Sequence, residues 1–412
     1  NTAVWAEPTI VRDRCGTFVS GTAPLYTRAG VQDGVLGIDI EVSQLAQEQR
    51  AQIWTIVGAC VVVGLASVLF GVWFSGRVAR PLVAVELELA RLRTLDLSHP
   101  FAITSRIREV ASIGEAVVNM KNGLRSFRKY VPGDVVAQLI RSNAEATLGA
   151  HRATLTIFFS DIADFTSISE QLSPEQVVKL LDRYLAGMSR TLAASGCTID
   201  KFIGDAVMGF WGAPNPVPNQ EAAACRAALG CLQMLQANQA AWAADGFPPV
   251  TARMGLHTGE VVVGNIGFDE RLAYTVIGDD VNVASRLEGL NKRFGTAIMV
   301  SEVTRAKAGD EFVTRCLGTI VVKGRTGGVK VHELVGFAAT ISATERAFID
   351  RFERGLALHD ARAFDAALVE FEAALAERPD DKAAAIYVER CRALIATPPP
   401  DGWSAAISMR EK

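Results

Sequence analysis

The sequence predicts an α+β domain with a central β-sheet, which follows a transmembrane helix and two parallel amphipathic helices and precedes a small α-helical tail. Three observations support this fold class. An uncharged segment covers residues 53–74, short apolar runs alternate with helical patterns between residues 151 and 337, and residues 346–396 are Ala-rich with a helical pattern. Strands that interleave with helices are typical of a sheet that is covered by helices.

Length and charge limit the organisation further. The chain has 412 residues and a net charge of −3. This length predicts two to four domains, and the charge gives no support for nucleic-acid binding. We expect an extracytoplasmic remnant at 1–50, a transmembrane helix at 51–75, a helical relay at 76–130, a helical linker at 131–150, the central domain at 151–337 and the helical tail at 338–412.

The uncharged segment is long enough to cross a bilayer. Residues 53–74 would form a helix of roughly 33 Å, and Trp54 and Trp73 lie near its two ends. A buried core helix is the alternative. Only Arg50 lies close before the segment, whereas four arginines follow it, at positions 77, 80, 91 and 93. This asymmetry places the C-terminal side in the cytoplasm and the chain in the cell (inner) membrane.

The first fifty residues are then external. Residues 34–42 alternate in the manner of a strand, and with 24–26 they resemble the end of a Cache-type sensor domain, the alternative being a plain extracytoplasmic strand. Such a sensor would bind an external ligand that the sequence does not identify. The chain begins with Asn1 and shows no signal-peptide pattern, so we expect a fragment whose upstream membrane segment is missing.

Two short amphipathic helices follow the membrane segment. Pro81 precedes the first, a polar break covers 96–104, and the second runs over 107–127 with Glu109 near its start. This arrangement resembles a HAMP relay, and a generic juxtamembrane coiled coil is the alternative. Helices this short need a partner to bury their apolar stripes, so both interpretations imply parallel dimer packing.

The central domain has a regular pattern of strands and helices. Strands are predicted at 153–159, 207–211, 250–256, 260–266 and 297–300, and helices at 174–194, 220–243 and 280–294. The predicted strands at 250–256 and 260–266 flank His257, Thr258 and Gly259, and this arrangement predicts a hairpin.

Two aspartates suggest phosphate chemistry. Asp161 and Asp205 lie about 44 residues apart, each after a short apolar run. Two carboxylates in one cleft suit a pair of hard cations that share phosphate oxygens. Asp161 ends a strand and opens a helix, whose N-terminal N–H groups would face a triphosphate, and Gly204 permits the tight turn before Asp205. Either aspartate alone could be an ordinary turn or N-cap residue.

One helix adds an arginine that suits a transition state. Asn282 and Arg286 are spaced i and i+4 on the predicted helix at 280–294, and hence on one face. We expect Arg286 to be buried and to face a cleft, where its forked donors suit a pentavalent phosphorus.

Four motifs together carry a family resemblance. They are Phe-Ser-Asp-Ile at 159–162, Asp-Lys-Phe-Ile-Gly-Asp-Ala at 200–206, Val-Ile-Gly-Asp-Asp-Val-Asn-Val-Ala-Ser-Arg-Leu-Glu at 276–288 and Val-Lys-Gly-Arg at 322–325. Residues from about 150 to 337 therefore resemble the catalytic domain of class III nucleotidyl cyclases, and the resemblance implies a ferredoxin-like βαββαβ fold.

The resemblance also implies residue roles. Two Mg²⁺ or Mn²⁺ ions per active site would bind at Asp161, Ile162 and Asp205. The purine would be recognised by Lys201 and Thr275, the ribose oriented by Asn282, the transition state stabilised by Arg286 and the pyrophosphate held by Lys323. In this family the metal residues come from one protomer and the purine, ribose and transition-state residues from the other, which implies a homodimer with shared sites.

The residues at the purine positions favour ATP over GTP. Lys201 would donate to adenine N1, and Thr275 would accept from the exocyclic amine. Similar guanylyl enzymes have Glu and a small residue such as Cys there. The Thr variant also marks a subclass described as bicarbonate-responsive, which makes that response a hypothesis. Some family members contact a phosphate with an arginine where this chain has Glu260, so that contact is in doubt here.

The sequence therefore predicts a membrane-bound receptor adenylyl cyclase that forms cyclic AMP. A guanylyl cyclase and a catalytically silent cyclase-like receptor are the alternatives. Retention of Asp161, Asp205, Asn282 and Arg286 argues against the silent receptor.

The tail resembles a tetratricopeptide-type helical hairpin. Its small and aromatic positions are Gly355, Phe364, Ala367, Phe371, Ala374 and Pro379. One repeat is too short to form a stable groove alone. A packing appendage on the central domain and a partner-binding module both remain open.

Overall fold

The computed structural model describes residues 4–6, 9–12, 16–103, 105, 107–127, 135–136, 147–268, 271–321, 328–400 and 402–408. Two compact units divide the chain: one comprises Asn1–Leu92 with Asp96–Asn122, the other Arg93–Leu95 with Gly123–Lys412. Most of the predicted linker at 131–150, and Lys323, lie outside the described residues.

The first unit begins with a small antiparallel sheet. Its strands are β1 (Trp5–Ala6), β2 (Val11–Arg12), β3 (Thr17–Tyr26) and β4 (Gln32–Glu41), and β1, β2 and β4 all pair with β3. The predicted strand at 34–42 corresponds to β4.

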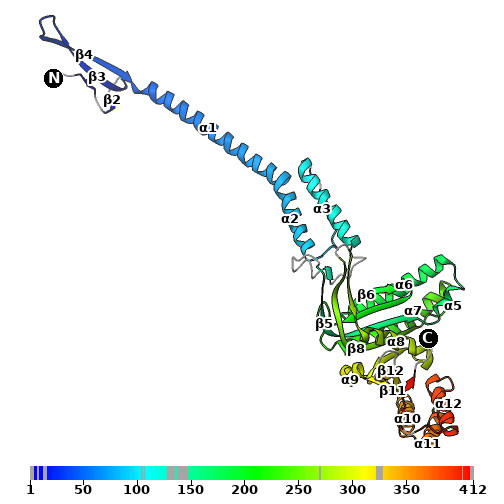
Figure 1. Cartoon of the computed structure of the whole chain (residues 1–412). Coiled ribbons are helices and arrows are strands. Elements are labelled where there is room, and N and C mark those ends of the chain that lie inside the picture. Colours follow the sequence, from blue (N-terminus) through cyan, green and yellow to red (C-terminus); the bar gives the residue numbers. More distant parts are fainter. Residues whose placement is uncertain are drawn as a thin grey trace. The chain divides into compact units, whose positions relative to one another are not determined.

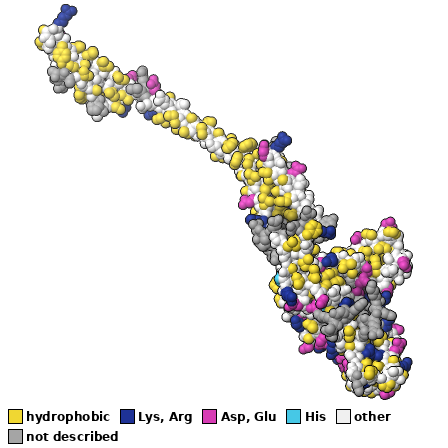
Figure 2. Space-filling model, viewed as in Figure 1, with side chains coloured by type: hydrophobic (Ala, Val, Ile, Leu, Met, Phe, Trp, Pro, Cys, Tyr) yellow, Lys and Arg dark blue, Asp and Glu magenta, His cyan; other side chains and the backbone are white. Residues whose placement is uncertain are grey.

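A continuous helical segment follows β4 (Figure 1). It consists of α1 (Val42–Phe74), a π-helical turn η1 (Ser75–Ala79) and α2 (Arg80–Arg93). Within Gln47–Arg93 an 18-residue stretch has a mean hydropathy of 2.4, and none of it is buried in the chain. Figure 2 shows hydrophobic side chains along this helix. A buried core helix would be covered by the rest of the chain, so these observations favour a membrane span by length and composition.

Pro81 lies in the first turn of α2, at the helix entry as predicted. Helix α2 is not separate from the membrane segment, however, because η1 joins it to α1 without a break. A proline lacks the N–H that would bond to the preceding turn, and a π-turn or kink is one way in which a helix accommodates that loss.

The second amphipathic helix is α3 (Arg108–Phe127), with Glu109 in its first turn, as predicted. Glu88 of α2 and Lys121 of α3 form an ion pair, and both side chains are buried. Lys121 also donates to the main-chain carbonyl of His99 over 2.5 Å. A buried lysine needs such partners because an unpaired buried charge is costly.

The second unit is built on a nine-stranded mixed sheet. Its strands are β5 (Gly149–Ile162), β6 (Thr198–Ile203), β7 (Ala206–Trp211), β8 (Ala252–Phe268), β9 (Arg271–Ile277), β10 (Ile298–Ser301), β11 (Phe312–Val321), β12 (Gly328–Phe337) and β13 (Ile407–Ser408). The order is β13-β11-β12-β10-β8-β5-β7-β6, and β9 pairs with β8. The helices between the strands are α5 (Phe165–Ser169), α6 (Pro174–Ala194), α7 (Gln220–Ala244), α8 (Asp279–Phe294) and α9 (Glu302–Ala308).

The predicted α+β class is confirmed. With α6 and α7 as the crossover helices, the elements from β5 to β8 follow the order βαββαβ (Figure 1). The three long helices predicted in this region match α6, α7 and α8 closely. Strands β6, β9, β11, β12 and β13 are not among the predicted strands.

The predicted hairpin at His257–Gly259 is wrong, because β8 is one strand of 17 residues. It pairs with β5 without a break from Gly149↔Asn265 to Ile162↔Ala252. A side chain at Gly259 would collide with Asp280 of α8, and one at Gly255 would collide with the α8 backbone at Ala284 and Glu288. These glycines therefore allow α8 to approach the strand closely, rather than forming a turn.

The two faces of the sheet carry different helices. Alternate residues of β5 point to opposite faces, so Phe158 joins the core with α6 and α7, whereas Ile157 joins Ala284 of α8. Helix α6 begins with Ser173 as N-cap in a capping box with Gln176, and it buries an i, i+4 row: Leu180, Tyr184, Met188 and Leu192.

The tail forms α10 (Ala343–Asp360), α11 (Phe364–Glu377) and α12 (Lys382–Ala396) (Figure 1). Phe352, Phe371 and Tyr387 share one hydrophobic core with Leu287 of α8, and the Tyr387 hydroxyl donates to the carbonyl of Leu317 on β11 over 2.8 Å. The tail therefore packs on the second unit, and whether it also binds a partner stays open.

Candidate active site

The first group of site residues lies where β5 ends beside the β6–β7 turn. Asp161 is near the end of β5, and Gly204, with φ of 66°, forms the predicted turn that presents Asp205. The main-chain N–H of Ile162 donates to Oδ2 of Asp205 over 3.1 Å. The two aspartates are therefore neighbours, as predicted, because β5 and β7 pair in the sheet.

These carboxylates lie in an environment that is unfavourable for negative charge. Burial, followed by hydrogen bonding to Asp205 and by the charges of Asp205 and Glu288, raises the pKa of Asp161 from 3.8 to about 7. Burial also raises the pKa of Glu288 to about 7; Arg253 opposes this rise and Asp205 adds to it. Burial combined with like charges disfavours ionisation, and a bound cation would reverse that effect.

The residues fit a magnesium-type ion whose shell is shared with a substrate. Among the described residues, no group of three or more His, Cys, Asp and Glu side chains is arranged to hold a metal. Two carboxylates are nevertheless enough when waters and phosphate oxygens supply the remaining ligands, as Mg²⁺ prefers. The side chain of Ile162 is buried and apolar, so this residue could contribute only its main-chain oxygen.

The second group lies at the edge of the sheet, on β6 and β9. Nζ of Lys201 is 3.2 Å from Oγ1 of Thr275, although 74 residues separate them in the sequence. The structure therefore brings together the two predicted purine-recognition residues.

A third residue, Asp200, completes this group and was not identified from the sequence. Its side chain is only 2% exposed, and Oδ1 lies 3.3 Å from Nζ of Lys201. The hydroxyl of Thr275 donates to Oδ2 of Asp200. Adjacent residues of a regular strand point to opposite faces, but the register shifts between Ile199 and Lys201, so Asp200 occupies an irregularity of β6.

Asn282 and Arg286 lie on the exposed side of α8. The expectation that Arg286 is buried is wrong for the single chain. Helix α8 buries its other face, which includes Val283 and Leu287, against the sheet and the tail. No ion pair joins Arg286 to another residue in the described part of the chain.

Two further predictions concern the phosphates. Lys323 lies outside the described residues, so its role stays a prediction. Glu260 forms an exposed ion pair with Arg152 at 2.7 Å, and so gives no positive charge at the position where some relatives have arginine.

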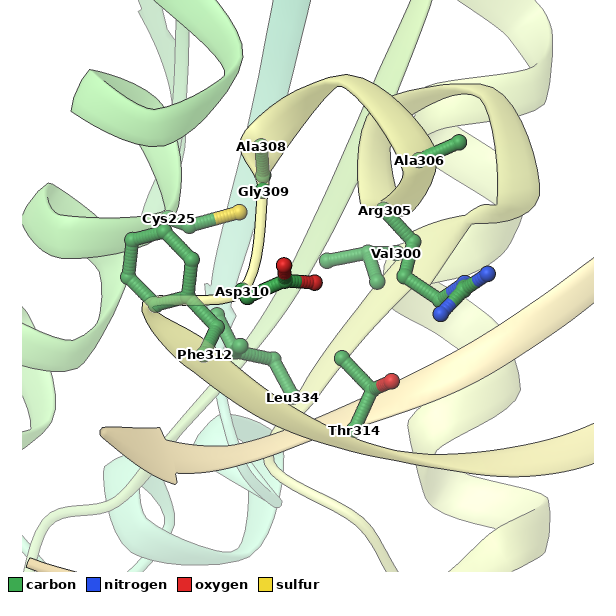
Figure 3. Close-up of a pocket in the computed structure, with 10 residues that line it drawn as sticks. All are labelled: Cys225, Val300, Arg305, Ala306, Ala308, Gly309, Asp310, Phe312, Thr314 and Leu334. Atoms are coloured by element: carbon green, nitrogen blue, oxygen red, sulfur yellow. The ribbon is translucent and has the colours of Figure 1, made fainter. Parts of the chain in front are cut away.

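A separate cavity of about 210 Å³ lies between α7, α9, β10 and β11 (Figure 3). Cys225, Val300 and Asp310 are among its lining residues. None of the predicted site residues lines it, so the cavity is distinct from the candidate active site.

A comparison with known families identifies the domain that contains both groups. Residues 150–336 match the family model of the adenylate and guanylate cyclase catalytic domain. This part of the chain belongs to that family. The predicted cyclase domain is thereby confirmed, and its carboxylates on β5 and after β6 lie inside the matched region.

Relatives that are named adenylate cyclases extend the similarity beyond the cyclase domain. The chain is 37% identical over 305 residues to adenylate cyclase 1 of Rhizobium meliloti (strain 1021), a match that covers 74% of this chain and 45% of the relative. It is 30% identical over 338 residues to the adenylate cyclase of Anabaena cylindrica, covering 76% of this chain and 65% of the relative. The chain thus spans about half to two thirds of these relatives.

A solved structure agrees with the cyclase fold. The structure of a bacterial light-regulated adenylyl cyclase has a TM-score of 0.51 to this chain, with 26% identity, and the match covers 60% of this chain and 71% of that one.

Proposed function

We propose that the protein is a membrane-bound receptor adenylyl cyclase, which converts ATP into 3′,5′-cyclic AMP and pyrophosphate. The observation that carries the choice of ATP is the contact between Lys201 and Thr275. A lysine donor beside a threonine acceptor matches adenine, which has an acceptor at N1 and a donor amine at C6. Guanine has N1–H and O6 in these places and would oppose both groups.

The carboxylate pair supports the phosphate chemistry. Asp161 and Asp205 would hold two Mg²⁺ or Mn²⁺ ions, with Ile162 contributing its main-chain oxygen. When bound, such ions would lower the pKa of the ribose 3′-hydroxyl and neutralise the triphosphate. Asn282 would orient the ribose, Arg286 would donate to the oxygens of the α-phosphorus as its charge develops, and Lys323 would hold the leaving pyrophosphate.

The geometry of α8 supports active sites shared between two copies of the chain. Glu288 acts on the pKa of Asp161, so it lies near this chain's own carboxylate pair. Arg286 precedes Glu288 by two positions, or roughly 200° around a helix, and is exposed. Arg286 is thus turned away from its own aspartates, as expected if it serves the aspartates of a partner in a homodimer.

Complementation tests this shared site. Asp161→Ala and Arg286→Ala homodimers should each lose cyclic AMP production, whereas co-expression of the two variants of the chain should restore about a quarter of wild-type activity, because half of the dimers are mixed and each has one intact site. Asp365→Ala and Arg354→Ala, on exposed faces of the tail, serve as matched controls that keep activity. No recovery in the co-expressed pair would contradict the shared site.

The receptor part of the proposal rests on the first unit. Residues 1–50 would form the sensor remnant for an unknown external ligand, 51–75 the membrane span and 76–130 the HAMP-like relay, with the cyclase domain in the cytoplasm. Cyclic nucleotide production by the full chain in membrane fractions, with ATP or GTP and Mn²⁺, tests activity, substrate and location together. Activity with GTP alone would favour a guanylyl cyclase, and inactivity with both would favour the silent receptor.

A further inference from the structure

We propose that Asp200 is a positioning residue for purine selectivity, because it fixes the direction in which the Thr275 hydroxyl donates its hydrogen. This inference rests on the proposed adenylyl cyclase function. It adds a residue that makes no contact with the substrate itself and controls one that does.

The surroundings of Asp200 make it an acceptor. Three donors face its buried carboxylate: the hydroxyl of Thr275 at Oδ2, the ammonium of Lys201 at Oδ1 and the main-chain N–H of Val276. Burial raises the pKa of Asp200, but its hydrogen bonds with Thr275 and Lys201 and the charge of Lys201 oppose that rise and favour the ionised carboxylate, which has no hydrogen to give. The hydrogen between Asp200 and Thr275 therefore comes from the threonine.

The hydrogen-bond capacity of Thr275 is then almost fully assigned. A hydroxyl has one hydrogen and two lone pairs. The hydrogen points to Asp200, and Nζ of Lys201 donates to one lone pair over 3.2 Å. One lone pair remains, so Thr275 can only accept from a ligand.

The capacity of Lys201 is assigned in the same way. Its ammonium has three hydrogens. One is directed to Asp200 and one to Thr275, which leaves one for a ligand. The group therefore presents one donor and one acceptor side by side, the complement of adenine N1 and its 6-amino group.

Guanine would meet two mismatches at this group. Its O6 would face the remaining lone pair of Thr275, and its N1–H would face the ammonium of Lys201. Without Asp200 the threonine hydroxyl could rotate and donate to O6, so one of the two mismatches would disappear. The carboxylate thus removes the alternative on which GTP depends.

The test measures kcat/KM for ATP and for GTP with the full chain in membranes. Asp200→Ala should lower the ATP to GTP ratio at least about tenfold, the effect expected for one hydrogen-bond mismatch. Asp200→Asn keeps a side-chain oxygen that can accept from Thr275, and its ratio should lie between those of wild type and Asp200→Ala.

A double variant separates this role from a structural one. Thr275→Val removes the hydroxyl, so adding Asp200→Ala to it should change the ratio less than twofold. If Asp200→Ala lacks a melting transition, Asp200→Leu replaces it, because leucine fills the space of the aspartate and offers no acceptor to the hydroxyl of Thr275, and the same fall in ratio is expected.

The role of Asp200 and the adenylyl cyclase function would be contradicted by different results. Equal losses of kcat/KM for both nucleotides, with an unchanged ratio, would show that Asp200 only supports the fold, and would overturn the inference. A wild-type chain that forms no cyclic AMP from ATP, or that prefers GTP, would instead contradict the proposed function.

Discussion

Asp161 is partly buried and the side chain of Asp200 is buried, and the surroundings of these two carboxylates differ. Asp161 faces two further carboxylates, those of Asp205 and Glu288, and its pKa is raised to about 7. Burial raises the pKa of Asp200 too, but Asp200 faces the hydroxyl of Thr275 and the ammonium of Lys201, which oppose that rise. One end of the candidate active site therefore gathers like charges, whereas the other balances its charge within the chain.

This difference shows two roles that a carboxylate shielded from water can have: it can bind a cation, or it can orient neighbouring hydrogen-bond donors. Buried like charges are unfavourable unless a cation joins them, so the Asp161 end is suited to bind one. A carboxylate that is surrounded by donors is already satisfied and fixes their orientation. The proposed metal end, with Asp161 and Asp205, would therefore be stabilised by a bound cation, whereas the proposed purine end, with Asp200, Lys201 and Thr275, already has its hydrogen bonds within the chain.

The largest expected effect comes from removing charge at the metal end. Asp205→Asn keeps the shape of the side chain but should lower cyclic AMP production by roughly a thousandfold or more, because it removes half of the charge proposed to hold the cations. Asp200→Asn, the matched change at the purine end, should lower it less than about tenfold. Initial rates of cyclic AMP formation with ATP and Mn²⁺ measure both effects. Similar losses in the two variants would contradict the proposal that the two carboxylates have different roles.

The next effect concerns the balance of charge at the purine end. Lys201→Glu with Thr275→Cys should lower kcat/KM for ATP by about a hundredfold and admit little GTP, because the new glutamate lies beside the buried Asp200. Adding Asp200→Asn removes that repulsion and should increase GTP use severalfold. Cyclic GMP production by the double and triple variants checks this. GTP use that does not depend on position 200 would show that the two carboxylates do not interact.

The smallest effect is on stability at different pH values. The raised pKa of Asp161 means that the folded state binds its proton more tightly than the unfolded chain, whose value is near 3.8. Its stabilising contribution is complete below about pH 4 and is lost as the pH rises towards 7. The metal-free protein should therefore melt a few degrees lower at pH 8 than at pH 5, and Asp161→Asn should show a smaller fall.

Metal binding provides the control for this pH effect. Mn²⁺ at pH 8 should raise the melting temperature of the wild type, because a ligand that binds only the folded state stabilises it. The same addition should do much less for Asp161→Asn. An identical pH dependence in the two proteins would mean that Asp161 does not carry the effect.

Much of the fold follows from local patterns. The ends of α6 were predicted from the helical pattern at 174–194, and Ser173, Pro174 and Gln176 form its observed cap. The turn at Gly204 was also predicted, because a left-handed residue between two apolar runs is a local signal. The predicted hairpin at His257–Gly259 was wrong because its conformation depends on distant residues. These three residues can form either a turn or an extended strand, and the long pairing of β8 with β5 favours the strand.

The sequence by itself determined the uncharged segment, the cyclase motifs around Asp161, Asp205 and Arg286, and the lysine and threonine that we propose recognise the purine. Only the tertiary structure decided how these groups are arranged. It brought Thr275 to Lys201 across 74 residues, placed Asp200 at an irregularity of β6 and left Arg286 exposed. Strand register and bulges arise from pairing between distant segments, and short-range periodicity carries no information about that pairing.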